Sequence, residues 1–402
     1  MPCIQQRHER ARVLVLDTAP GVWGAQNYLL RMVGPLAERG VDLILAAPAG
    51  LELAEHWRAR SLLSHEIALS LERSVRRGDG NDARVSARAA AREAAALVRN
   101  VGVIRRAARE VGADLIWANG HAMHLDGALA GRLAGIPVVL HLHEELPQTF
   151  GRLVRAAAVA LSTRSVAVSE AIATALPRPL ARRVKVIGNG VDVELFGPAV
   201  PDPEVRASLG ATPADTLVVA LTRLDPKKRI EDLIEAAADL LDEPRWRLAF
   251  VGTTSAFPDY ATRVRALGEQ RLGDRVTFAG RREDVVDVLN AADVVAHAGV
   301  VEGTPLCLLE AQACGKPVVA YRTSGVSESV VDGVTGLLAP PRDVPGLAGR
   351  LRTLVGDPEQ RATMGRAARA HAVARDGIEA QIERNAALLS GVLRRQLRAP
   401  TN

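Results

Sequence analysis

The sequence predicts an α/β fold in which two doubly wound domains follow one another along the chain. At 402 residues the chain exceeds one comfortable core, so two domains of roughly 180 to 200 residues are expected. Short apolar segments rich in β-formers alternate with longer helical patterns almost from end to end. These segments lack polar alternation, which is typical of strands that are buried on both faces of a parallel sheet.

The expected strands fall into two groups of six. In the first half they are residues 12–17, 41–46, 114–118, 138–143, 165–169 and 184–187; in the second they are 217–221, 248–252, 276–279, 294–297, 318–321 and 336–338. Glycines and prolines interrupt residues 189–213, so the domain boundary should lie there. We expect domains of residues 1–190 and 191–376, with a helix of about residues 377–402 packing back on the first domain. A ligand cleft should face the carboxyl ends of both sets of strands.

The composition restricts the class of protein. A hydrophobic share of 48% and a charged share of 24% are ordinary for a globular domain. The net charge of +5 favours anionic ligands or surfaces, but only 3% of residues are aromatic and no nucleic-acid-binding module is recognised, so we expect no nucleic-acid partner. The three cysteines lack zinc spacing, and no segment has the length and hydrophobicity of a signal peptide or membrane span. A cytoplasmic location is the simplest expectation.

One region departs from the regular alternation, because residues 57–110 contain twelve arginines and six acidic residues. Arg84, Arg88, Arg92 and Arg99 have spacings compatible with one helical face, so a basic amphipathic surface for an anionic membrane is one hypothesis. The alternative is a solvated helix in a chain whose positive charge is nearly all arginine. Residues 78–82 are expected to form a mobile loop.

The segment of residues 301–311 carries the most functional information. Glu302 and Glu310 lie eight residues apart, and a Gly-Thr-Pro turn follows the first of them. Thr304 is a good N-cap and Pro305 suits the first helical position, which predicts a helix over about residues 305–313. The amides at the start of that helix would form a positive end beside Glu302, suited to the hydroxyls and phosphates of a sugar nucleotide. A capped surface helix with two incidental glutamates is the alternative.

A basic turn follows the expected strand at residues 217–221. Arg223 and Lys228 leave the strand end together, in a chain with only four lysines of which two are adjacent. Arginine can bind two phosphate oxygens at once, and lysine adds a mobile point charge. Both would stabilise a departing diphosphate as its charge grows. A solvated basic turn is the alternative for this segment.

The first half offers two further candidates at strand ends. Gly24 lies between the strand ending at Asp17 and the next helix, where a missing side chain lets backbone amides approach a phosphate. The spacing is neither Gly-x-Gly-x-x-Gly nor a P-loop, so a nicotinamide or Walker-type site is disfavoured. His143 ends the strand at residues 138–143 and should project into the cleft, whereas His141 is expected to be a core or supporting residue.

A metal site at this histidine pair is not expected. A third ligand is lacking, because His121 and His124 are assigned to a separate loop.

Taken together, these segments resemble the retaining glycosyltransferases of family 4, which have the GT-B architecture of two facing Rossmann-like domains. The resemblance covers almost the whole chain, and its most specific part is the Glu-x7-Glu pattern of Glu302 and Glu310 with the following Ala-Gln-Ala-Cys-Gly-Lys-Pro-Val-Val-Ala. Further matching segments are residues 24–26, 165–171, 186–192, 223–228, 276–280 and 291–336.

The resemblance implies transfer of a sugar from a nucleotide diphosphate sugar to an acceptor hydroxyl with retention. Carried over, the catalytic residues would be His143, which faces the reacting sugar, Arg223 and Lys228, which bind the diphosphate, and Glu302. Donor binding would further involve Gly24 at the phosphates, Glu310 at the ribose and the turn of Gly303, Thr304, Pro305 and Leu306 at the sugar hydroxyls. The departing phosphate oxygen helps to deprotonate the acceptor in such enzymes, and neither a side-chain nucleophile nor a metal or other cofactor is expected.

Three departures from the family pattern affect the expected donor pocket. Arg229 stands where glycine is usual, His297-Ala298-Gly299 stands where Pro-Ser is common, and Thr304 replaces a frequent phenylalanine. The acceptor stays open among a glycan, a lipid-linked molecule and a small molecule. A nucleotide-sugar epimerase or hydrolase, and a non-catalytic partner that binds a sugar nucleotide, are the alternative functions.

Overall fold

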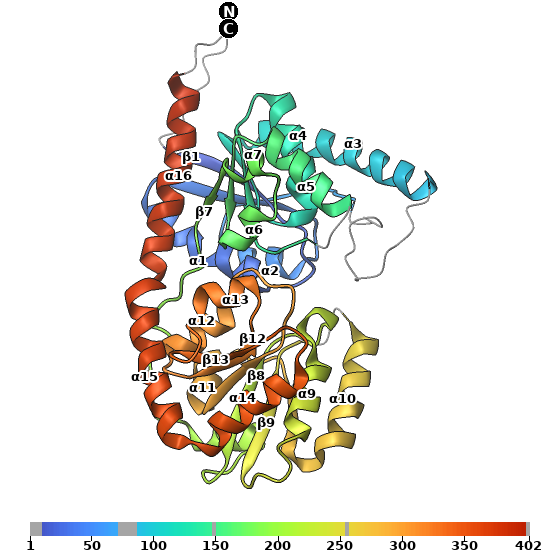
Figure 1. The fold of residues 1–402 in the computed structure, drawn as a ribbon. Helices are drawn as coiled ribbons and strands as arrows, with labels where there is room; N and C mark the ends of the chain where they lie inside the picture. Colours follow the sequence, from blue (N-terminus) through green and yellow to red (C-terminus); the bar gives the residue numbers. More distant parts are fainter. Residues whose placement is uncertain (1–9, 71–86, 147–149, 254–256, 399–402) are drawn as a thin grey trace, which may run out of the picture. The chain divides into compact units, whose positions relative to one another are not determined.

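The computed structural model describes residues 10–70, 87–146, 150–253 and 257–398. The chain forms two compact units, which are shown in Figure 1. The first unit comprises residues 1–187 together with 381–402, and the second unit comprises residues 188–380.

A seven-stranded parallel sheet forms the centre of the first unit, in the order β3-β2-β1-β4-β5-β6-β7. Because the strand order changes direction between β1 and β4, the carboxyl ends of these strands form the topological switch point of a doubly wound sheet. The strands are β1 (Ala11–Leu16), β2 (Val41–Ala47), β3 (Ser64–Glu66), β4 (Leu115–Ala118), β5 (Val138–Leu142), β6 (Arg164–Ala167) and β7 (Val184–Val186).

Helices cover the sheet of the first unit, and the last of them comes from the far end of the chain. Helix α16 (Ile378–Arg398) contributes its residues from Gln381 onward to this unit, where Leu389 and Val392 are buried. The other helices are α1 (Gly24–Glu38), α2 (Glu52–Ala59), α3 (Ala87–Glu110), η1 (His121–Met123), α4 (His124–Ala134), α5 (Phe150–Leu161), α6 (Glu170–Thr174) and α7 (Arg178–Ala181).

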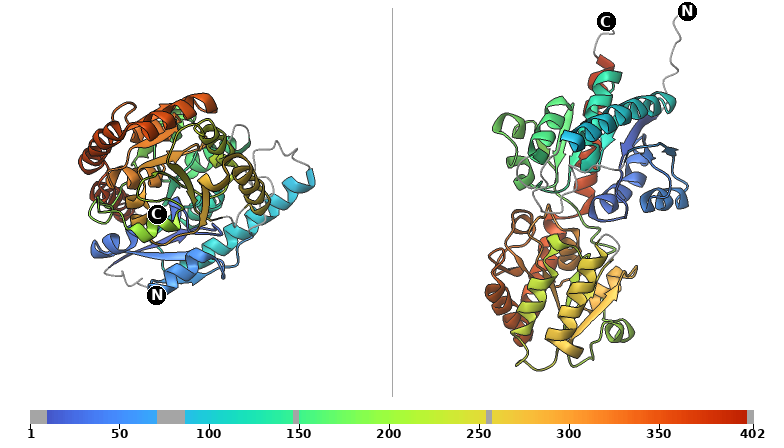
Figure 2. Two further views of the ribbon diagram at one scale, coloured as in Figure 1. Left: turned by 90° about the horizontal axis from the view of Figure 1, so that it is seen from below. Right: turned by 90° about the vertical axis from the view of Figure 1, so that its right-hand side faces the viewer.

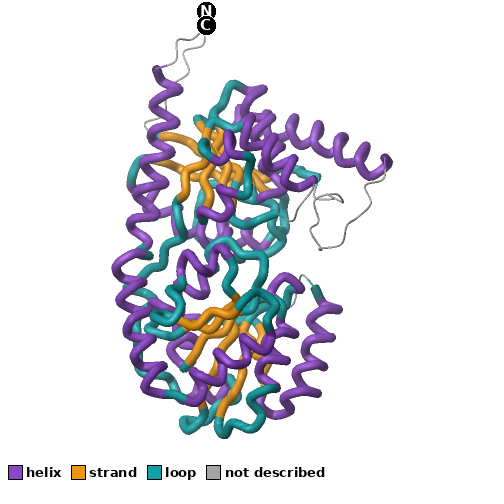
Figure 3. Tube along the Cα trace, in the orientation of Figure 1, coloured by secondary structure: helices purple, strands orange, loops and turns teal. Residues whose placement is uncertain are grey.

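The second unit is built on a six-stranded parallel sheet in the order β10-β9-β8-β11-β12-β13, with helices around it (Figure 3). Its strands are β8 (Thr216–Leu221), β9 (Trp246–Val251), β10 (Val276–Gly280), β11 (Val294–His297), β12 (Val318–Tyr321) and β13 (Gly336–Ala339). Its helices are α8 (Pro203–Ser208), η2 (Pro226–Lys228), α9 (Ile230–Ala238), α10 (Pro258–Leu272), η3 (Gly273–Arg275), α11 (Val285–Ala291), α12 (Leu306–Ala313), α13 (Ser324–Ser329), α14 (Val344–Gly356) and α15 (Pro358–Arg375).

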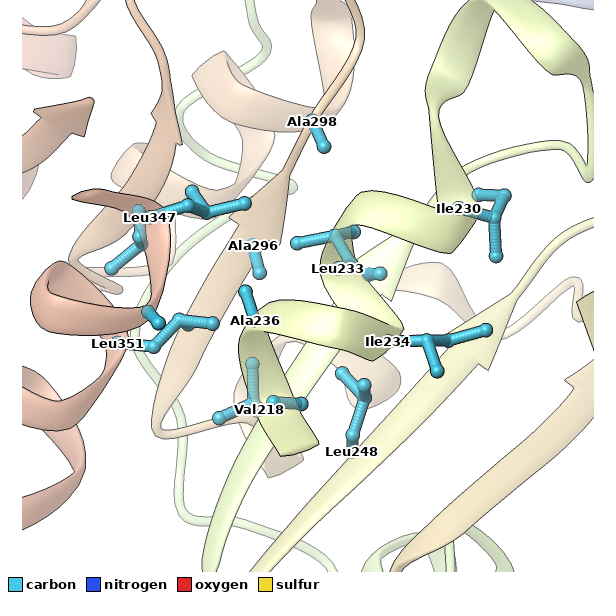
Figure 4. Close-up of a cluster of buried hydrophobic side chains, with 14 of the residues drawn as sticks. Val218, Ile230, Leu233, Ile234, Ala236, Leu248, Ala296, Ala298, Leu347 and Leu351 are labelled. Carbon is cyan, nitrogen blue, oxygen red and sulfur yellow. The ribbon is translucent and has the colours of Figure 1, made fainter. Parts of the chain in front are cut away.

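Both faces of this second sheet are covered by apolar side chains. On one face, Leu233 of α9 packs with Val218 of β8, Leu248 of β9 and Leu347 of α14 in one buried cluster (Figure 4). A second cluster on the other face includes Leu309 of α12. Burial on two sides explains why the strands are continuous apolar segments in the sequence.

All twelve expected strands are present, and the prediction of two doubly wound parallel sheets is confirmed. The sequence reading missed β3, which pairs with β2 over Ser64–Glu66. Two of its three side chains are exposed, so this short edge strand has no apolar pattern that could have revealed it. None of the helices among the described residues is long and apolar enough to cross a membrane.

Candidate active site

The predicted diphosphate-binding residues of the second unit lie just after β8, in a turn that is held by one aspartate. Asp225 accepts a hydrogen bond from the backbone amide of Lys227 at 2.9 Å, which caps the short helix η2. Its other carboxylate oxygen lies 3.1 Å from Nη2 of Arg223. Because Asp225 is only 3% exposed, this arrangement fixes the start of the basic turn from within the protein.

Glu302 lies at the centre of a buried charged cluster after the adjacent strand β11. Nζ of Lys228 donates to Oε1 of Glu302 at 2.6 Å, and Nε2 of His297 lies 3.0 Å from the same oxygen. Burial by itself would raise the pKa of Glu302, but the positive charge of Lys228 and the contact with His297 together lower it to about 2. The carboxylate is therefore ionised at neutral pH.

Two glycines allow the loop that carries Glu302 to lie close to its neighbours. A Cβ atom on Gly299 would be 2.0 Å from Oε1 of Glu302 and 2.5 Å from Nε2 of His297. A Cβ atom on Gly325 of α13 would be 1.1 Å from the carbonyl oxygen of Gly303. The loop can therefore adopt this position only because residues 299 and 325 are glycines, which have no side chain.

The helix after this loop begins one residue later than expected, and the predicted N-cap is wrong. Pro305 occupies the N-cap position, with extended backbone angles and no side-chain cap, so α12 begins at Leu306. Nδ2 of Asn189 donates to the carbonyl oxygen of Thr304 at 2.7 Å. That carbonyl would otherwise accept the first hydrogen bond of a helix capped by Thr304, whereas the amide of Leu308 bonds to Pro305.

Glu310 lies within α12 and is 7% exposed, as befits a residue that faces the interior side of its unit. Lys228 and Glu302 are thus in direct contact. Arg223 lies in the same connection after β8 as Lys228, and Glu310 lies in the same connection after β11 as Glu302. His297 was noted only as a departure from the family pattern in the donor pocket and was not predicted to contact Glu302. Its place at the carboxyl end of a parallel strand was the signal that could have identified it.

In the first unit, Gly24 is the first residue of α1, directly after the loop that leaves β1. Asp17 lies in that loop and is fully buried. Its Oδ2 accepts hydrogen bonds from Nδ2 of Asn119 at 2.7 Å and from Nε2 of Gln26 at 3.0 Å. The loop that leads to Gly24 is therefore held by hydrogen bonds between buried polar side chains, and these bonds were not identified from the sequence.

His143 follows β5 and is partly exposed, with its Nε2 at 2.9 Å from Oδ1 of Asn119. His141 is 1% exposed, and its Nδ1 lies 3.4 Å from Nε2 of His143. Burial, together with the nearby His141 and His124, lowers the pKa of His143 well below its ordinary value, so the ring is neutral at neutral pH.

The separation expected between this pair and His124 is wrong. His124 begins α4, but its Nε2 lies 2.9 Å from the backbone oxygen of His141, because α4 packs against β5. Three histidines thus gather at the end of β5. Across the described residues, no group of three or more His, Cys, Asp or Glu side chains has the arrangement of a metal site.

The arginine-rich region is partly described. Arg92, Arg99 and Arg106 are exposed on α3, whose N-terminal end extends beyond the rest of its unit in Figure 1 and in the left view of Figure 2. Their spacing of seven residues places them on one helical face. Arg84, the side chain of Arg88 and the expected mobile loop at residues 78–82 lie outside the described residues.

Two family models match the chain one after the other. The model described as "Glycosyltransferase Family 4" matches residues 22–195, and the model described as "Glycosyl transferases group 1" matches residues 201–371. The chain belongs to family 4 of the glycosyltransferases. The family expected from the Glu-x7-Glu segment is thereby confirmed.

Curated relatives of this family 4 chain match it over about half of its length. A D-inositol 3-phosphate glycosyltransferase of Mycobacterium sp. (strain JLS) is 39% identical over 196 residues, which are 47% of the chain and 43% of that relative. A GDP-mannose-dependent monoacylated alpha-(1-6)-phosphatidylinositol monomannoside mannosyltransferase of Corynebacterium glutamicum is 37% identical over 195 residues, which are 46% of the chain and 50% of the relative. The matched region therefore spans no more than half of either relative.

Among solved structures, Anabaena Alr3699/HepE in complex with UDP and glucose is similar over nearly the whole chain. The similarity covers 95% of this chain and 100% of the other, with a TM-score of 0.78 and 27% identity. The expected GT-B fold class is confirmed by this similarity, together with the two parallel Rossmann-like sheets.

Proposed function

We propose that the chain is a retaining glycosyltransferase that moves a sugar from a nucleotide diphosphate sugar to an acceptor hydroxyl. The observation that carries the proposal is the buried, ionised Glu302, held by Lys228 and His297 beside the start of α12. A buried carboxylate next to a lysine and the N-terminal amides of a helix offers both acceptors for sugar hydroxyls and donors for phosphate oxygens. Membership of family 4 supports the same reading.

In the proposed role assignment, Arg223 and Lys228 bind the diphosphate. The ammonium group of Lys228 has three N–H donors, of which one is used on Glu302. The others are available to phosphate oxygens, so one side chain links the diphosphate to the carboxylate that holds the sugar. Arg223 can bind two phosphate oxygens in a bidentate manner.

The remaining roles concern the sugar and the nucleoside. Glu302 has its Oε1 occupied by Lys228 and His297, which leaves Oε2 to accept from a sugar hydroxyl. Glu310 accepts from the ribose, with the backbone of residues 303–306 at the sugar. Gly24 approaches the phosphates and His143 the reacting sugar.

The proposed reaction requires no covalent intermediate on the protein. The bond between the anomeric carbon and the diphosphate oxygen breaks, and the acceptor oxygen bonds to that carbon on the same face. The acceptor proton passes to the departing phosphate oxygen. The positive charges of Arg223 and Lys228 stabilise the diphosphate as it leaves.

The names of these relatives indicate which substrates to test first. The solved relative holds UDP and glucose, whereas the name of one curated relative specifies GDP-mannose and an acylated phosphatidylinositol mannoside. D-inositol 3-phosphate appears in the name of another. We therefore propose UDP and GDP sugars as donors, and hydroxyl groups of soluble or lipid-linked polyols among the acceptors.

The test is thermal unfolding with EDTA present against UDP-, GDP-, ADP- and dTDP-sugars and their free diphosphates. Trp246 is the single tryptophan of the second unit. In a variant with the other three tryptophans replaced by phenylalanine, tryptophan fluorescence therefore reports the unfolding of that unit alone. A ligand at about 100 times its Kd adds roughly 2.7 kcal/mol and raises Tm by several degrees. Absence of any shift in folded protein would argue against a site for these sugar nucleotides, both in the transferase and in the non-catalytic alternative.

Substitution of Lys228 supplies the matched activity test. We expect Lys228→Ala to lower kcat/KM by roughly 10- to 1000-fold, because it removes a charge from the diphosphate and leaves Glu302 without its closest cation. Lys227→Ala removes the same charge from the neighbouring position of η2 and should change kcat/KM by less than about threefold. Equal effects of the two substitutions would contradict the role of Lys228. Turnover of donor without acceptor would favour the epimerase or hydrolase.

A further inference from the structure

A continuous series of buried and partly buried hydrogen bonds connects the end of β1 with the C-terminal helix α16, within the first unit. It passes from Asp17 through Asn119, His143 and His141 to Asn385. All of these residues except His143 are at most 2% exposed. His143 is therefore the one member of the series with access to a ligand.

The Asp17 end determines the orientation of the Asn119 amide group. Nδ2 of Asn119 lies 2.7 Å from Oδ2 of Asp17 and 3.3 Å from the backbone oxygen of Ala25. Both partners can only accept, so the amide nitrogen must face them. The amide oxygen of Asn119 then faces His143, and a carbonyl oxygen at 2.9 Å from Nε2 requires a proton on that nitrogen.

The Asn385 end determines where His141 carries its proton. Nδ2 of Asn385 donates to the backbone oxygen of Gln381 at 2.8 Å and to Oη of Tyr28 at 2.7 Å. Its Oδ1 therefore faces Nε2 of His141 at 3.2 Å, so this nitrogen carries the His141 proton.

The Nδ1 atom of His141 is the second acceptor that faces His143. Burial lowers the pKa of His141 to about 3, so the ring is neutral and its Nδ1 carries no proton. This atom lies 3.4 Å from Nε2 of His143 and can only accept from it. Two acceptors from opposite ends of the series therefore converge on one nitrogen of His143.

We propose that Asn119 and His141 are positioning residues that hold His143 in its Nε2–H tautomer, so that its Nδ1 accepts a hydrogen bond from a substrate hydroxyl. The tautomer follows from hydrogen bonds within the first unit. The use of Nδ1 by a hydroxyl rests on the proposed transferase function. Because α16 supplies Asn385, the last helix of the chain takes part in orienting a histidine at the end of β5.

The first experiment observes the tautomer directly in the whole protein. Two-bond 1H–15N correlation spectra of 15N-histidine-labelled protein at neutral pH distinguish a protonated Nε2 from a protonated Nδ1. His143→Gln identifies the signals of residue 143 by their loss. We expect one species with the proton on Nε2. A proton on Nδ1, or comparable populations of both forms, would overturn the proposal even if sugar transfer were demonstrated.

The second experiment removes one acceptor. Asn119→Ala should yield a mixture of tautomers at His143 and lower kcat about tenfold with little change in donor KM, as expected for loss of one oriented hydrogen bond. Asn100→Ala is the matched control, because Asn100 is also fully buried and bonds to an aspartate, at 3.2 Å from Oδ1 of Asp126. It should leave the tautomer unchanged.

The outcomes separate the two proposals. If Asn119→Ala fails to fold, the wild-type spectrum still decides the tautomer. If His143 has the expected tautomer but no sugar is transferred from any donor, the proposed function fails and the tautomer stands. If Asn119→Ala transfers sugar with unchanged kcat, the positioning role for catalysis is overturned.

Discussion

At the residue scale, Glu302 shows how two neighbouring side chains determine the state of a third. A carboxyl group that is 8% exposed would take up a proton readily if it were alone. Lys228 and His297 both contact its Oε1, and the net result is a carboxylate that stays ionised far below neutral pH.

This arrangement predicts a pH dependence of stability. The pKa of Glu302 is lowered from 4.5 to about 2 in the folded protein, so its ionised form stabilises the fold above about pH 4.5 and this contribution is lost as the pH falls toward 2. Between pH 5 and pH 3, the free energy of unfolding of the wild type should fall by about 2 kcal/mol more than that of Glu302→Gln. Urea unfolding at the two pH values measures this difference.

A control for general acid sensitivity is available on α10. Glu269 is exposed, so Glu269→Gln should follow the wild type across the same pH range. If Glu302→Gln loses as much stability on acidification as the wild type, the charged cluster does not stabilise the fold as described.

At the scale of elements, the loop that carries Glu302 depends on its contact with α13. Gly325 lies so close to the carbonyl group of Gly303 that no side chain fits between them. The loop after β11 is therefore held both by its contact with α13 and by Asn189, which binds the carbonyl of Thr304. Packing of these elements, and not the loop sequence alone, sets where Glu302 lies.

We expect Gly325→Ala to destabilise the protein and to reduce transfer. The added methyl group must displace either α13 or residue 303, at a cost of about 1 to 3 kcal/mol, which corresponds to a fall in Tm of several degrees. Gly349→Ala in α14 is the matched control, because its Cβ atom would meet nothing within 4 Å. It should be neutral or stabilise by up to about 1 kcal/mol. Equal Tm values for the two variants would contradict this account.

At the scale of the whole molecule, the excess of positively charged side chains is found on α3 as well as in the candidate site. The net charge is +5, and Arg92 and Arg99 are exposed on the same face of this helix. An exposed basic helix is attracted to anionic lipid by about 1 kcal/mol per arginine near the surface. A lipid-linked polyol, which is among the proposed acceptors, would make such attraction useful.

We therefore expect sedimentation with phosphatidylserine vesicles at low salt and its loss at high salt. The double substitution Arg92→Glu and Arg99→Glu lowers the net charge by four, from +5 to +1, and should weaken vesicle binding about tenfold or more. Arg366→Glu with Arg375→Glu makes the same change on exposed positions of α15 and should have a smaller effect. If the two double variants bind alike, net charge accounts for the attraction and α3 is not the docking element.

Much of the fold was predictable because burial on two faces leaves an unmistakable pattern of apolar segments. The twelve expected strands rest on that pattern, whereas β3 has too few buried side chains to produce it. Lys228 and Glu302 were assigned to one site through the resemblance of their segments to family 4. Their contact at 2.6 Å is possible because β8 and β11 are neighbours in that sheet.

The sequence by itself determined the two doubly wound sheets, the family and the residue types available at the strand ends, because each depends on local patterns or on motifs of fixed spacing. Only the tertiary structure decided which remote groups meet them. Asn189 binds the carbonyl of Thr304 just before α12, α4 brings His124 to His141, and α16 places Asn385 beside the same histidine. Hydrogen-bond orientation depends on partners far along the chain, and those partners become neighbours only when the cores form.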